Sequence, residues 1–227
     1  MSLIIGFNVR DGIVVAGDRC TTIRENGITS HCFDSRKIVI LNKRLVVLHC
    51  GDHFVTDNIT AHEFLESCTD LITQDMDVTA LPLAILSKYK TAGYRNDNIF
   101  LICGFDKNND GFIYKVNVSK NSIEQTYGNK IFGGTWDGVY NIAAPILRSA
   151  KCDQISLLDA ATLCKMAIET TGRSQLHCGI ETTVSYTADI YVMHKSGNVK
   201  WFSGDAGFLV QEDQIKEEDI LEETSYE

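Results

Sequence analysis

The residue with the clearest chemical potential is Ser2, which directly follows Met1. Serine is small enough to permit removal of an initiator methionine, and removal would place a hydroxyl nucleophile and a free α-amine on one residue. An α-amine has a pKa of about 7.7–8.0, against about 10.4 for lysine, so much of it can act as a base near neutral pH. Ser2 could then supply both groups that acyl transfer needs. A serine after methionine is also common in proteins without this chemistry, so its neighbours decide the interpretation.

Other residue types offer alternatives. Cys50 and Cys178 are candidate thiol nucleophiles. Zinc could use the His-Cys pairs, but none has the usual Cys-x-x-Cys or helical His-x-x-x-His spacing; the pairs are His31-Cys32, His49-Cys50 and His177-Cys178. Residues 106–111 begin like a calcium loop, yet Asn117 stands where a bidentate Glu is required, which favours a polar turn. Glycine-rich phosphate-binding motifs are absent, so nucleotide chemistry has no support. With none of these patterns complete, we expect no metal and no cofactor.

Composition restricts the class of protein. The chain has 227 residues, 44% hydrophobic and 22% charged, with 2 Pro, which is typical of a folded domain. Of the net charge of −9, most lies in residues 211–227, where eight acids face one base, Lys216. We expect a folded domain over 1–210, an acidic tail over 211–227, and no nucleic-acid or membrane partner, because no basic stripe is present. With no leader sequence at Met1, eight cysteines favour reduced thiols in the cytoplasm.

The hydrophobic pattern predicts the elements that must position these residues. Strands are expected at 3–9 and 13–17 around an Asp11-Gly12 turn, then at 37–41 and 45–50, with four strands before any helix. Helical periodicity begins at about residue 57 and recurs over 80–92. Strands are then expected at 98–105, 112–118 and 122–127, followed by helices around 139–150 and 157–168. The last expected strands are 188–194 and 198–202. Hairpin connections imply antiparallel sheets, so the expected fold is α+β, a four-layer αββα sandwich of two antiparallel sheets.

Several segments taken together resemble the proteasome β-subunit family, and in style its bacterial proteasome-like members. They are Ser2–Gly6, Asp11–Arg19, Arg36–Ile40 and Leu45–Gly51, with about three extra residues between Asp18 and Lys37. The resemblance implies an N-terminal-nucleophile hydrolase fold. Its specific motifs cover only the first quarter of the chain.

The resemblance also implies roles for individual residues. Ser2 stands at the nucleophile position, Asp18 and Lys37 at the acidic and lysine positions, and Gly51 at the glycine whose backbone N–H serves the oxyanion hole. Lys37 buried beside Asp18 would keep its charge and lower the effective pKa of the Ser2 hydroxyl, while Asp18 satisfies the ammonium. The alternative without catalysis is that Asp18 and Lys37 form a structural ion pair and that Gly51 is an ordinary glycine at a strand end.

Supporting positions match the family less well. Thr135, in an expected glycine-rich turn, falls near the place of a supporting serine. Gln175 and Cys178 replace the family's supporting Asp and Ser. A pocket for the residue before the scissile bond would be lined by Ser35, Val39, His49 and His53. Imidazoles that donate hydrogen bonds, and carry charge below a pH of about 6.5, predict a preference for acidic or polar side chains.

The resulting hypothesis is a serine-type N-terminal-nucleophile peptidase that forms an acyl-enzyme on Ser2. By the same resemblance it would be a homo-oligomer of ring or stacked-ring form, acting on peptides or unfolded proteins, with an ATPase as a compatible partner. Two alternatives remain. One is a catalytically silent assembly subunit, and the other is a small-amide hydrolase or acyl transferase of the same fold.

Overall fold

The computed structural model describes residues 2–25, 28–56, 58–72, 78–94, 96–128 and 130–203. They contain two five-stranded sheets and two two-stranded sheets, all antiparallel. The first five-stranded sheet has the order β12 (Gly133–Gly138), β1 (Leu3–Val9), β2 (Gly12–Asp18), β13 (Ala188–His194) and β14 (Val199–Phe202). The second has the order β11 (Ser122–Tyr127), β10 (Gly111–Asn117), β9 (Asn98–Phe105), β6 (Leu45–Gly51) and β5 (Ile38–Asn42). The short sheets pair β3 (Thr21–Glu25) with β4 (Ile28–Cys32), and β7 (Phe54–Thr56) with β8 (Ile59–Thr60).

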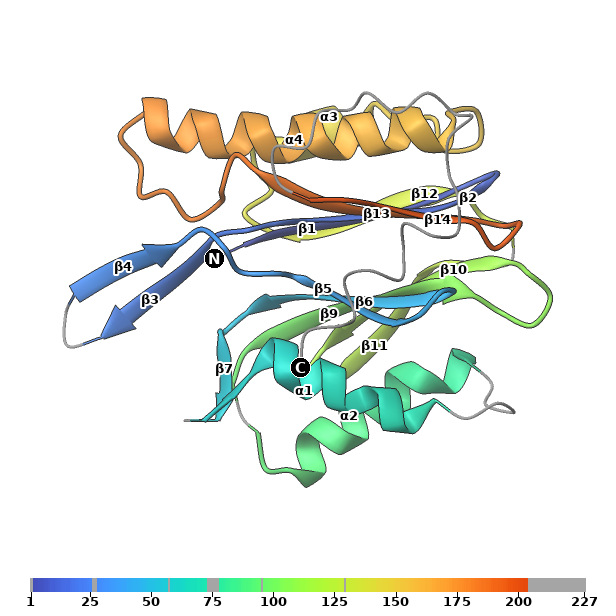
Figure 1. Ribbon diagram of the computed structural model, residues 1–227, viewed down its shortest axis with the longest axis horizontal. Coiled ribbons are helices and arrows are strands. Elements are labelled where there is room, and N and C mark those ends of the chain that lie inside the picture. The colour runs from blue at the N-terminus through green and yellow to red at the C-terminus, as the bar shows by residue number, and fades with distance from the viewer. Residues whose placement is uncertain are drawn as a thin grey trace.

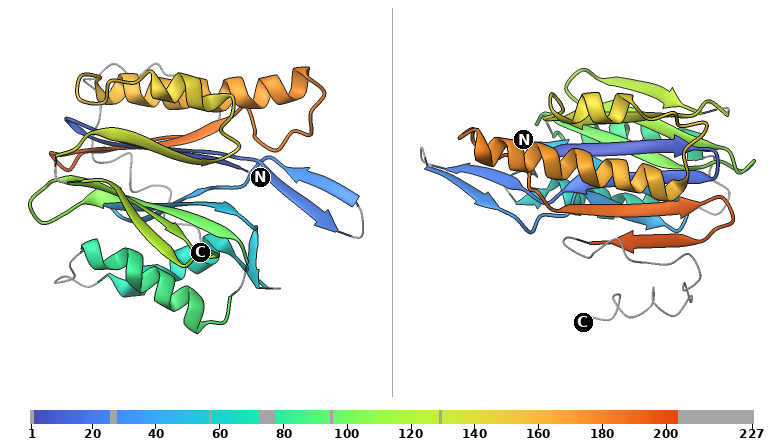
Figure 2. Two further views of the ribbon diagram at one scale, coloured as in Figure 1. Left: turned by 180° about the vertical axis from the view of Figure 1, so that it is seen from behind. Right: turned by 90° about the horizontal axis from the view of Figure 1, so that it is seen from above.

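The two large sheets face each other, with helices on their outer sides (Figure 1; Figure 2). Helices α3 (Ala143–Arg148) and α4 (Leu157–His177) cover the first sheet. Helices α1 (Ala61–Glu66) and α2 (Leu81–Thr91), with the 3₁₀ turns η1 (Ser67–Leu71) and η2 (Val78–Ala80), cover the second. The predicted α+β class with antiparallel sheets is confirmed.

Strand β1 shows how the sequence builds these layers. Its side chains are buried on both faces, and alternate residues enter different cores because side chains along a strand point to opposite sides. Leu3 and Ile5 pack toward α4, whereas Ile4 packs between the two sheets. A run of apolar residues without polar alternation is therefore what a strand in this position requires.

Local signals in the sequence agree with the structure at several elements. β1 and β2 pair across the Asp11-Gly12 turn, and residues 106–110 form the turn between β9 and β10. In that turn Asp106 Oδ1 accepts hydrogen bonds from the N–H groups of Asn108 and Asp110, which is a turn contact rather than evidence of an ion site. The expected capping box of Ser156 and Asp159 begins α4.

Three expectations about the elements were wrong. Eight strands, not four, precede α1. Residues 21–25 pair with 28–32 in a pair of strands that projects from the body (Figure 1), and residues 54–56 pair with 59–60 in a short one. The helix expected from about 57 is only six residues long before it tightens into η1. Residues 133–138 are not a turn but strand β12, which pairs with β1. Its glycines make room for ring atoms: a Cβ on Gly134 would lie 2.2 Å from the Phe7 ring.

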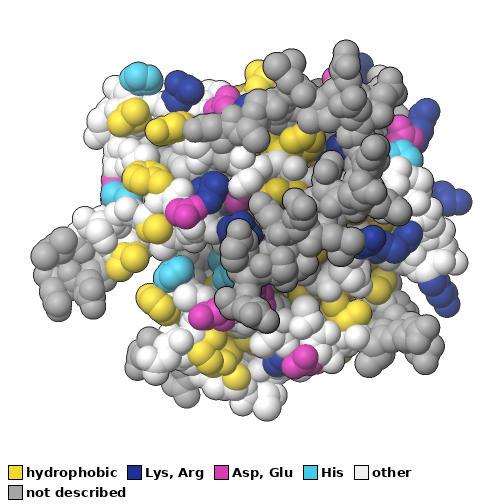
Figure 3. Space-filling view, viewed as in Figure 1, with side chains coloured by type: hydrophobic (Ala, Val, Ile, Leu, Met, Phe, Trp, Pro, Cys, Tyr) yellow, Lys and Arg dark blue, Asp and Glu magenta, His cyan; other side chains and the backbone are white. Residues whose placement is uncertain are grey.

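The expected acidic tail over 211–227 lies outside the described residues. In the described part of the chain, every helix is too short or too polar to cross a membrane. The face shown in Figure 3 carries both acidic and basic side chains, with apolar ones between them.

Candidate active site

Ser2 directly precedes β1 and is buried. Its carbonyl accepts a hydrogen bond from the N–H of Val139 (2.8 Å), just beyond the end of β12. Leu3 pairs with Gly138 in the adjoining register position. The backbone of Ser2 is thus held against β12 and does not extend freely from the sheet.

Asp18 is the last residue of β2 and is fully buried. Its Oδ1 accepts from the N–H of Leu3 (2.9 Å), and its Oδ2 accepts from the N–H groups of Cys20 (2.8 Å) and Ser185 (3.1 Å). Burial raises the pKa of Asp18, while the Lys37 charge and the three N–H donors oppose that rise. The contact with Leu3 places this carboxyl group on the peptide bond that follows Ser2.

Lys37 immediately precedes β5 and has only 4% of its surface exposed. Its Nζ donates to Thr21 Oγ1 (2.9 Å) and Ser35 Oγ (3.4 Å). Its stem lies against Gly17, where an added Cβ would be 2.7 Å from Lys37 Cβ. Burial lowers the pKa of Lys37, and the Asp18 carboxylate opposes this shift.

Asp18 and Lys37 interact electrostatically without forming the expected close ion pair. Among the described residues, the ion pairs shorter than 4 Å do not include these two. Backbone N–H groups satisfy Asp18, and hydroxyl groups satisfy the Lys37 ammonium. The expectation that Asp18 itself satisfies the ammonium is therefore corrected: each charge shifts the pKa of the other group without a direct ion pair.

Gly51 ends β6 with a φ of 118°, in the region that favours glycine. A Cβ at this position would lie 2.0 Å from the carbonyl oxygen of Asp97. Two residues earlier, the His49 N–H donates to the Lys37 carbonyl (3.0 Å), which joins β6 to the segment that carries the lysine. The structure thus explains on local grounds why glycine stands here.

We expect Gly51→Ala to lower the free energy of unfolding by about 2 kcal/mol or more, because it adds a backbone clash to an unfavourable φ. Gly93→Ala is the matched control: Gly93 also has a positive φ (78°), but an added Cβ would meet nothing within 4 Å. This control should lose only about 1 kcal/mol. Urea unfolding of both variants measures the difference, and equal losses would show that the Asp97 contact relaxes at no cost.

The four expected pocket residues differ in their surroundings. Ser35 is half-buried and accepts from Lys37, whereas Val39 packs into the core beneath α1 and α2. His49 is buried with no partner on Nε2, and its ring lies 5.8 Å from that of His62, a residue that the sequence did not single out. His53 is half-buried against Phe54.

The electrostatic environment of these imidazoles changes the pocket hypothesis. Burial lowers the pKa of His49 well below its usual value, and the Lys37 charge lowers it further. The pKa of His53 is lowered by the same two causes. Both rings are therefore neutral at neutral pH. Any polar preference must come from neutral hydrogen bonding, and not from imidazolium charge as the sequence suggested.

The expected supporting residues do not gather around Ser2. Thr135 pairs with Gly6, four positions along β1 from Ser2, which is roughly 13 Å at the usual rise of a strand. Gln175 is buried, but its amide is used by the loop after α4: Oε1 accepts from the N–H groups of Thr183 and Val184, and Nε2 donates to Thr183 Oγ1. Cys178 is exposed at the end of α4.

The structure instead brings Thr21 and Ser185 to the charged pair. Thr21 lies three residues after Asp18, a spacing that could have been noticed. Ser185 lies 167 residues from Asp18 and contacts it through a backbone N–H, so its type and local sequence carry no signal.

One alternative nucleophile, Cys50, lies in an environment that disfavours its reaction. Burial raises the pKa of the Cys50 thiol far above its usual value, which disfavours the reactive thiolate. All eight cysteines are free. Within the described ranges, no three His, Cys, Asp or Glu side chains are grouped as metal ligands.

The fold and site together define an α+β protein of two facing antiparallel sheets, with a buried carboxyl group bonded to the first strand and a buried lysine packed against the second. No protein-family model matches the chain, and no curated protein matches its sequence. Solved structures do resemble it. An Anbu (Gly-1) mutant from Hyphomicrobium sp. strain MC1 has a TM-score of 0.68 at 13% identity, covering 93% of this chain and 89% of its own.

Two further solved structures are equally similar. Anbu from the same Hyphomicrobium strain has a TM-score of 0.68 at 15% identity, over 91% of this chain and 89% of that one. Anbu (ancestral beta-subunit) from Yersinia bercovieri has a TM-score of 0.68 at 14% identity, over 90% and 88%. These likenesses establish a shared fold across nearly the whole chain.

The comparisons correct the family resemblance drawn from the sequence. The proteasome β-subunit family was the wrong identification, because the similar structures are Anbu proteins, which are proteasome-like but distinct, and no family model matches.

Proposed function

We propose that this chain is an N-terminal-nucleophile hydrolase that cleaves peptide bonds through an acyl-enzyme on Ser2. The observation that carries the proposal is the hydrogen bond from the Leu3 N–H to Asp18. It fixes a buried carboxyl group on the peptide next to Ser2, with the Lys37 charge close enough to shift the pKa of that carboxyl group. The Anbu fold supports the same assignment, and we propose that the facing sheets and outer helices form the four-layer αββα sandwich of this enzyme class.

The chemistry requires that the peptide bond before Ser2 be cleaved, which frees its α-amine. That amine takes the hydroxyl proton, directly or through water, as Oγ attacks the substrate carbonyl. The tetrahedral intermediate then collapses to an ester on Ser2, and the leaving amine of the substrate receives the proton. Water attacks the ester in a second cycle, releases the carboxylic acid and restores Ser2.

Lys37 and Gly51 stabilise charge in this scheme. The buried Lys37 ammonium favours the developing negative charge near Ser2 Oγ because it acts in a region from which water is excluded. The backbone N–H of Gly51 receives the oxyanion, a contribution of roughly 3 kcal/mol for one such donor. Asp18 orients the start of β1 through Leu3 and balances the lysine charge.

For substrates, we expect a preference for polar side chains before the scissile bond that does not change between pH 6 and 8, because His49 stays neutral there. A peptide library profiled at both pH values measures it. His49→Leu should shift the profile toward apolar side chains severalfold, while His194→Leu, at an exposed position, should leave it unchanged. A wild-type profile dominated by Leu or Phe contradicts the proposed pocket.

The working form is proposed to be a cytoplasmic homo-oligomer, a ring or stacked rings, acting on peptides or unfolded proteins. One of the similar structures is named an ancestral beta-subunit, that is, a component of an assembly. An ATPase that unfolds substrates is compatible with such an assembly.

A second candidate is a catalytically silent assembly subunit of the same fold. The position of Gln175 favours it, because its amide holds the 183–184 loop and leaves no carboxyl group there to assist the terminal amine. A substrate panel separates the candidates. Cleavage of peptides with acylation of Ser2 supports the peptidase, turnover of single amides alone supports a small-amide hydrolase, and neither reaction supports the silent subunit.

A further inference from the structure

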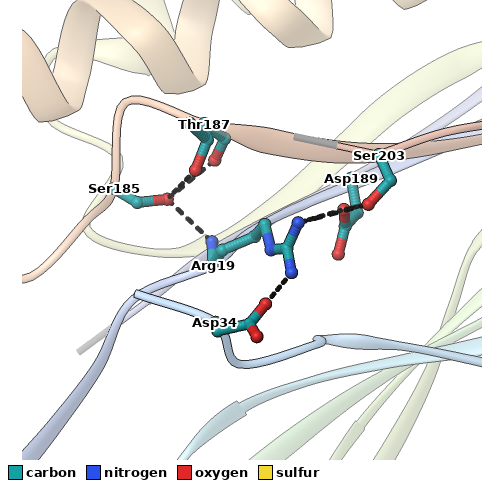
Figure 4. Close-up of polar contacts among 6 residues, drawn as sticks. All are labelled: Arg19, Asp34, Ser185, Thr187, Asp189 and Ser203. Atoms are coloured by element: carbon teal, nitrogen blue, oxygen red, sulfur yellow. Dashed lines mark hydrogen bonds and ion pairs between the residues drawn. The ribbon is translucent and has the colours of Figure 1, made fainter. Parts of the chain in front are cut away.

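Arg19 follows Asp18 directly and lies at the centre of a polar network (Figure 4). Its side chain is 18% exposed. One terminal nitrogen pairs with Asp34. The other donates to Ser203 Oγ (3.2 Å) and lies 3.9 Å from Asp189 Oδ1, a fully buried carboxyl oxygen that also accepts from Ser203 Oγ (2.9 Å). The guanidinium therefore holds three groups from different parts of the chain.

The backbone of Arg19 makes two further contacts. Its N–H donates to Ser185 Oγ (2.8 Å), and its carbonyl accepts from the N–H of Ser35 (3.0 Å). Ser185 Oγ in turn donates to the carbonyl of Thr187 (2.7 Å), which fixes the direction of the hydroxyl. Main chain and side chain thus bind the same two segments, 34–35 and 185–189.

Both segments reach the charged pair of the site. Ser185 donates its N–H to Asp18 Oδ2, and Ser35 Oγ accepts from Lys37 Nζ. We propose that Arg19 is a positioning residue that sets the environment of Asp18 and Lys37 by holding Ser185 and Ser35 in place. This inference rests on the proposed function for its catalytic consequence, but the positioning itself concerns only the geometry of this chain.

The arrangement requires arginine rather than any cation. Two terminal nitrogens in a planar fork reach Asp34 on one side and Ser203 with Asp189 on the other. A lysine ammonium is a single point charge on a flexible stem and cannot hold both sides at once. Arg19→Lys therefore keeps the charge beside Asp189 while releasing one of the two segments.

The test compares the full-length wild type with Arg19→Lys and Asp34→Asn. Arg10→Lys, at an exposed turn, is the matched control. The rate of labelling by a peptide β-lactone is measured at several β-lactone concentrations across pH 5–9. These rates give the maximal rate and the half-saturating concentration at each pH. We expect Arg19→Lys to lower the maximal rate at least tenfold with little change in the half-saturating concentration, because groups displaced by about 1 Å lose rate more than binding. The acid limb of the pH–rate profile of Arg19→Lys should also move to higher pH. Displacement of Ser185 weakens the N–H donor that lowers the pKa of Asp18.

Asp34→Asn should show the same changes at smaller size. Asp34 is 81% exposed, so we expect Asp34→Asn to fold and to test the proposal even if Arg19→Lys unfolds the protein. Amide hydrogen exchange at Ser185 and Ser35 gives a readout that needs no activity. We expect at least tenfold faster exchange in Arg19→Lys and no change in Arg10→Lys.

The outcomes separate the two proposals. If the wild type is not labelled, but the Ser185 and Ser35 amides lose protection in Arg19→Lys, then the proposed function is rejected and the positioning role stands. Unchanged exchange in Arg19→Lys overturns the positioning role whatever the labelling shows. A labelled series in which only the half-saturating concentration rises also overturns it.

Discussion

Ser2→Ala is expected to abolish peptide hydrolysis and covalent labelling, lowering the rate by roughly 10⁴-fold or more, because it removes the proposed nucleophile. Ser2→Thr keeps a hydroxyl on the same residue and should retain measurable turnover. Steady-state hydrolysis of a fluorogenic peptide and labelling by a β-lactone measure both variants.

We expect Ser2→Ala to assemble and to have the stability of the wild type although it is inactive. The contact that fixes residue 2 uses its backbone carbonyl and the N–H of Val139, which alanine preserves. Ser87→Ala, at an exposed position on α2, is the control for loss of a hydroxyl elsewhere. If Ser2→Ala were labelled at the wild-type rate, the nucleophile would have to be another residue.

Lys37→Met is expected to lower the maximal hydrolysis rate by roughly 10²–10³-fold, since it removes the buried positive charge that we propose stabilises the reacting hydroxyl. Methionine has a similar length, so the space beside Gly17 stays filled. The substitution leaves Thr21 and Ser35 without their ammonium donor. A loss of less than threefold, with the protein folded, would contradict the electrostatic role of Lys37.

The same variant makes a pH-dependent prediction with a defined sign. Asp18 has a folded pKa above its ordinary value of 3.8, so the folded state binds this proton more tightly than the unfolded state. The free energy of unfolding therefore falls as pH rises from about 3.8 to the folded pKa of Asp18. Lys37 limits that rise in pKa. Lys37→Met should raise the pKa of Asp18 further and extend the loss of stability to higher pH.

Urea unfolding between pH 4 and 8 measures this effect. Adding Asp18→Asn to Lys37→Met removes the titrating group and should abolish the extra pH dependence. If the double variant keeps it, then a group other than Asp18 titrates in this window.

The sequence predicted the elements whose signals are local. The Asp11-Gly12 turn and the Ser156 capping box need only neighbouring residues, and the structure has both. Strand β12 was missed because its sequence, Gly-Gly-Thr-Trp-Asp-Gly, suggests a turn unless one knows that the Phe7 ring fills the space above Gly134. The β3–β4 hairpin was missed because its strands lie outside both large sheets.

The candidate site shows the same division. Ser2, Asp18 and Lys37 could be named from the start of the chain because they lie in or beside its first strands. Thr135 was placed near Ser2 on the assumption of a turn, whereas the register of β12 moves it to Gly6. Ser185 and the Arg19 network join segments more than 160 residues apart, so only the folded chain reveals them.

The most direct test of the central claim is intact-mass measurement of the purified protein before and after reaction with a β-lactone, followed by peptide mapping. We expect the mature chain to begin at Ser2 with a free amine and to gain one adduct, located on Ser2. A chain that keeps a residue before Ser2 yet still hydrolyses peptides, or an adduct on Cys178, would contradict it.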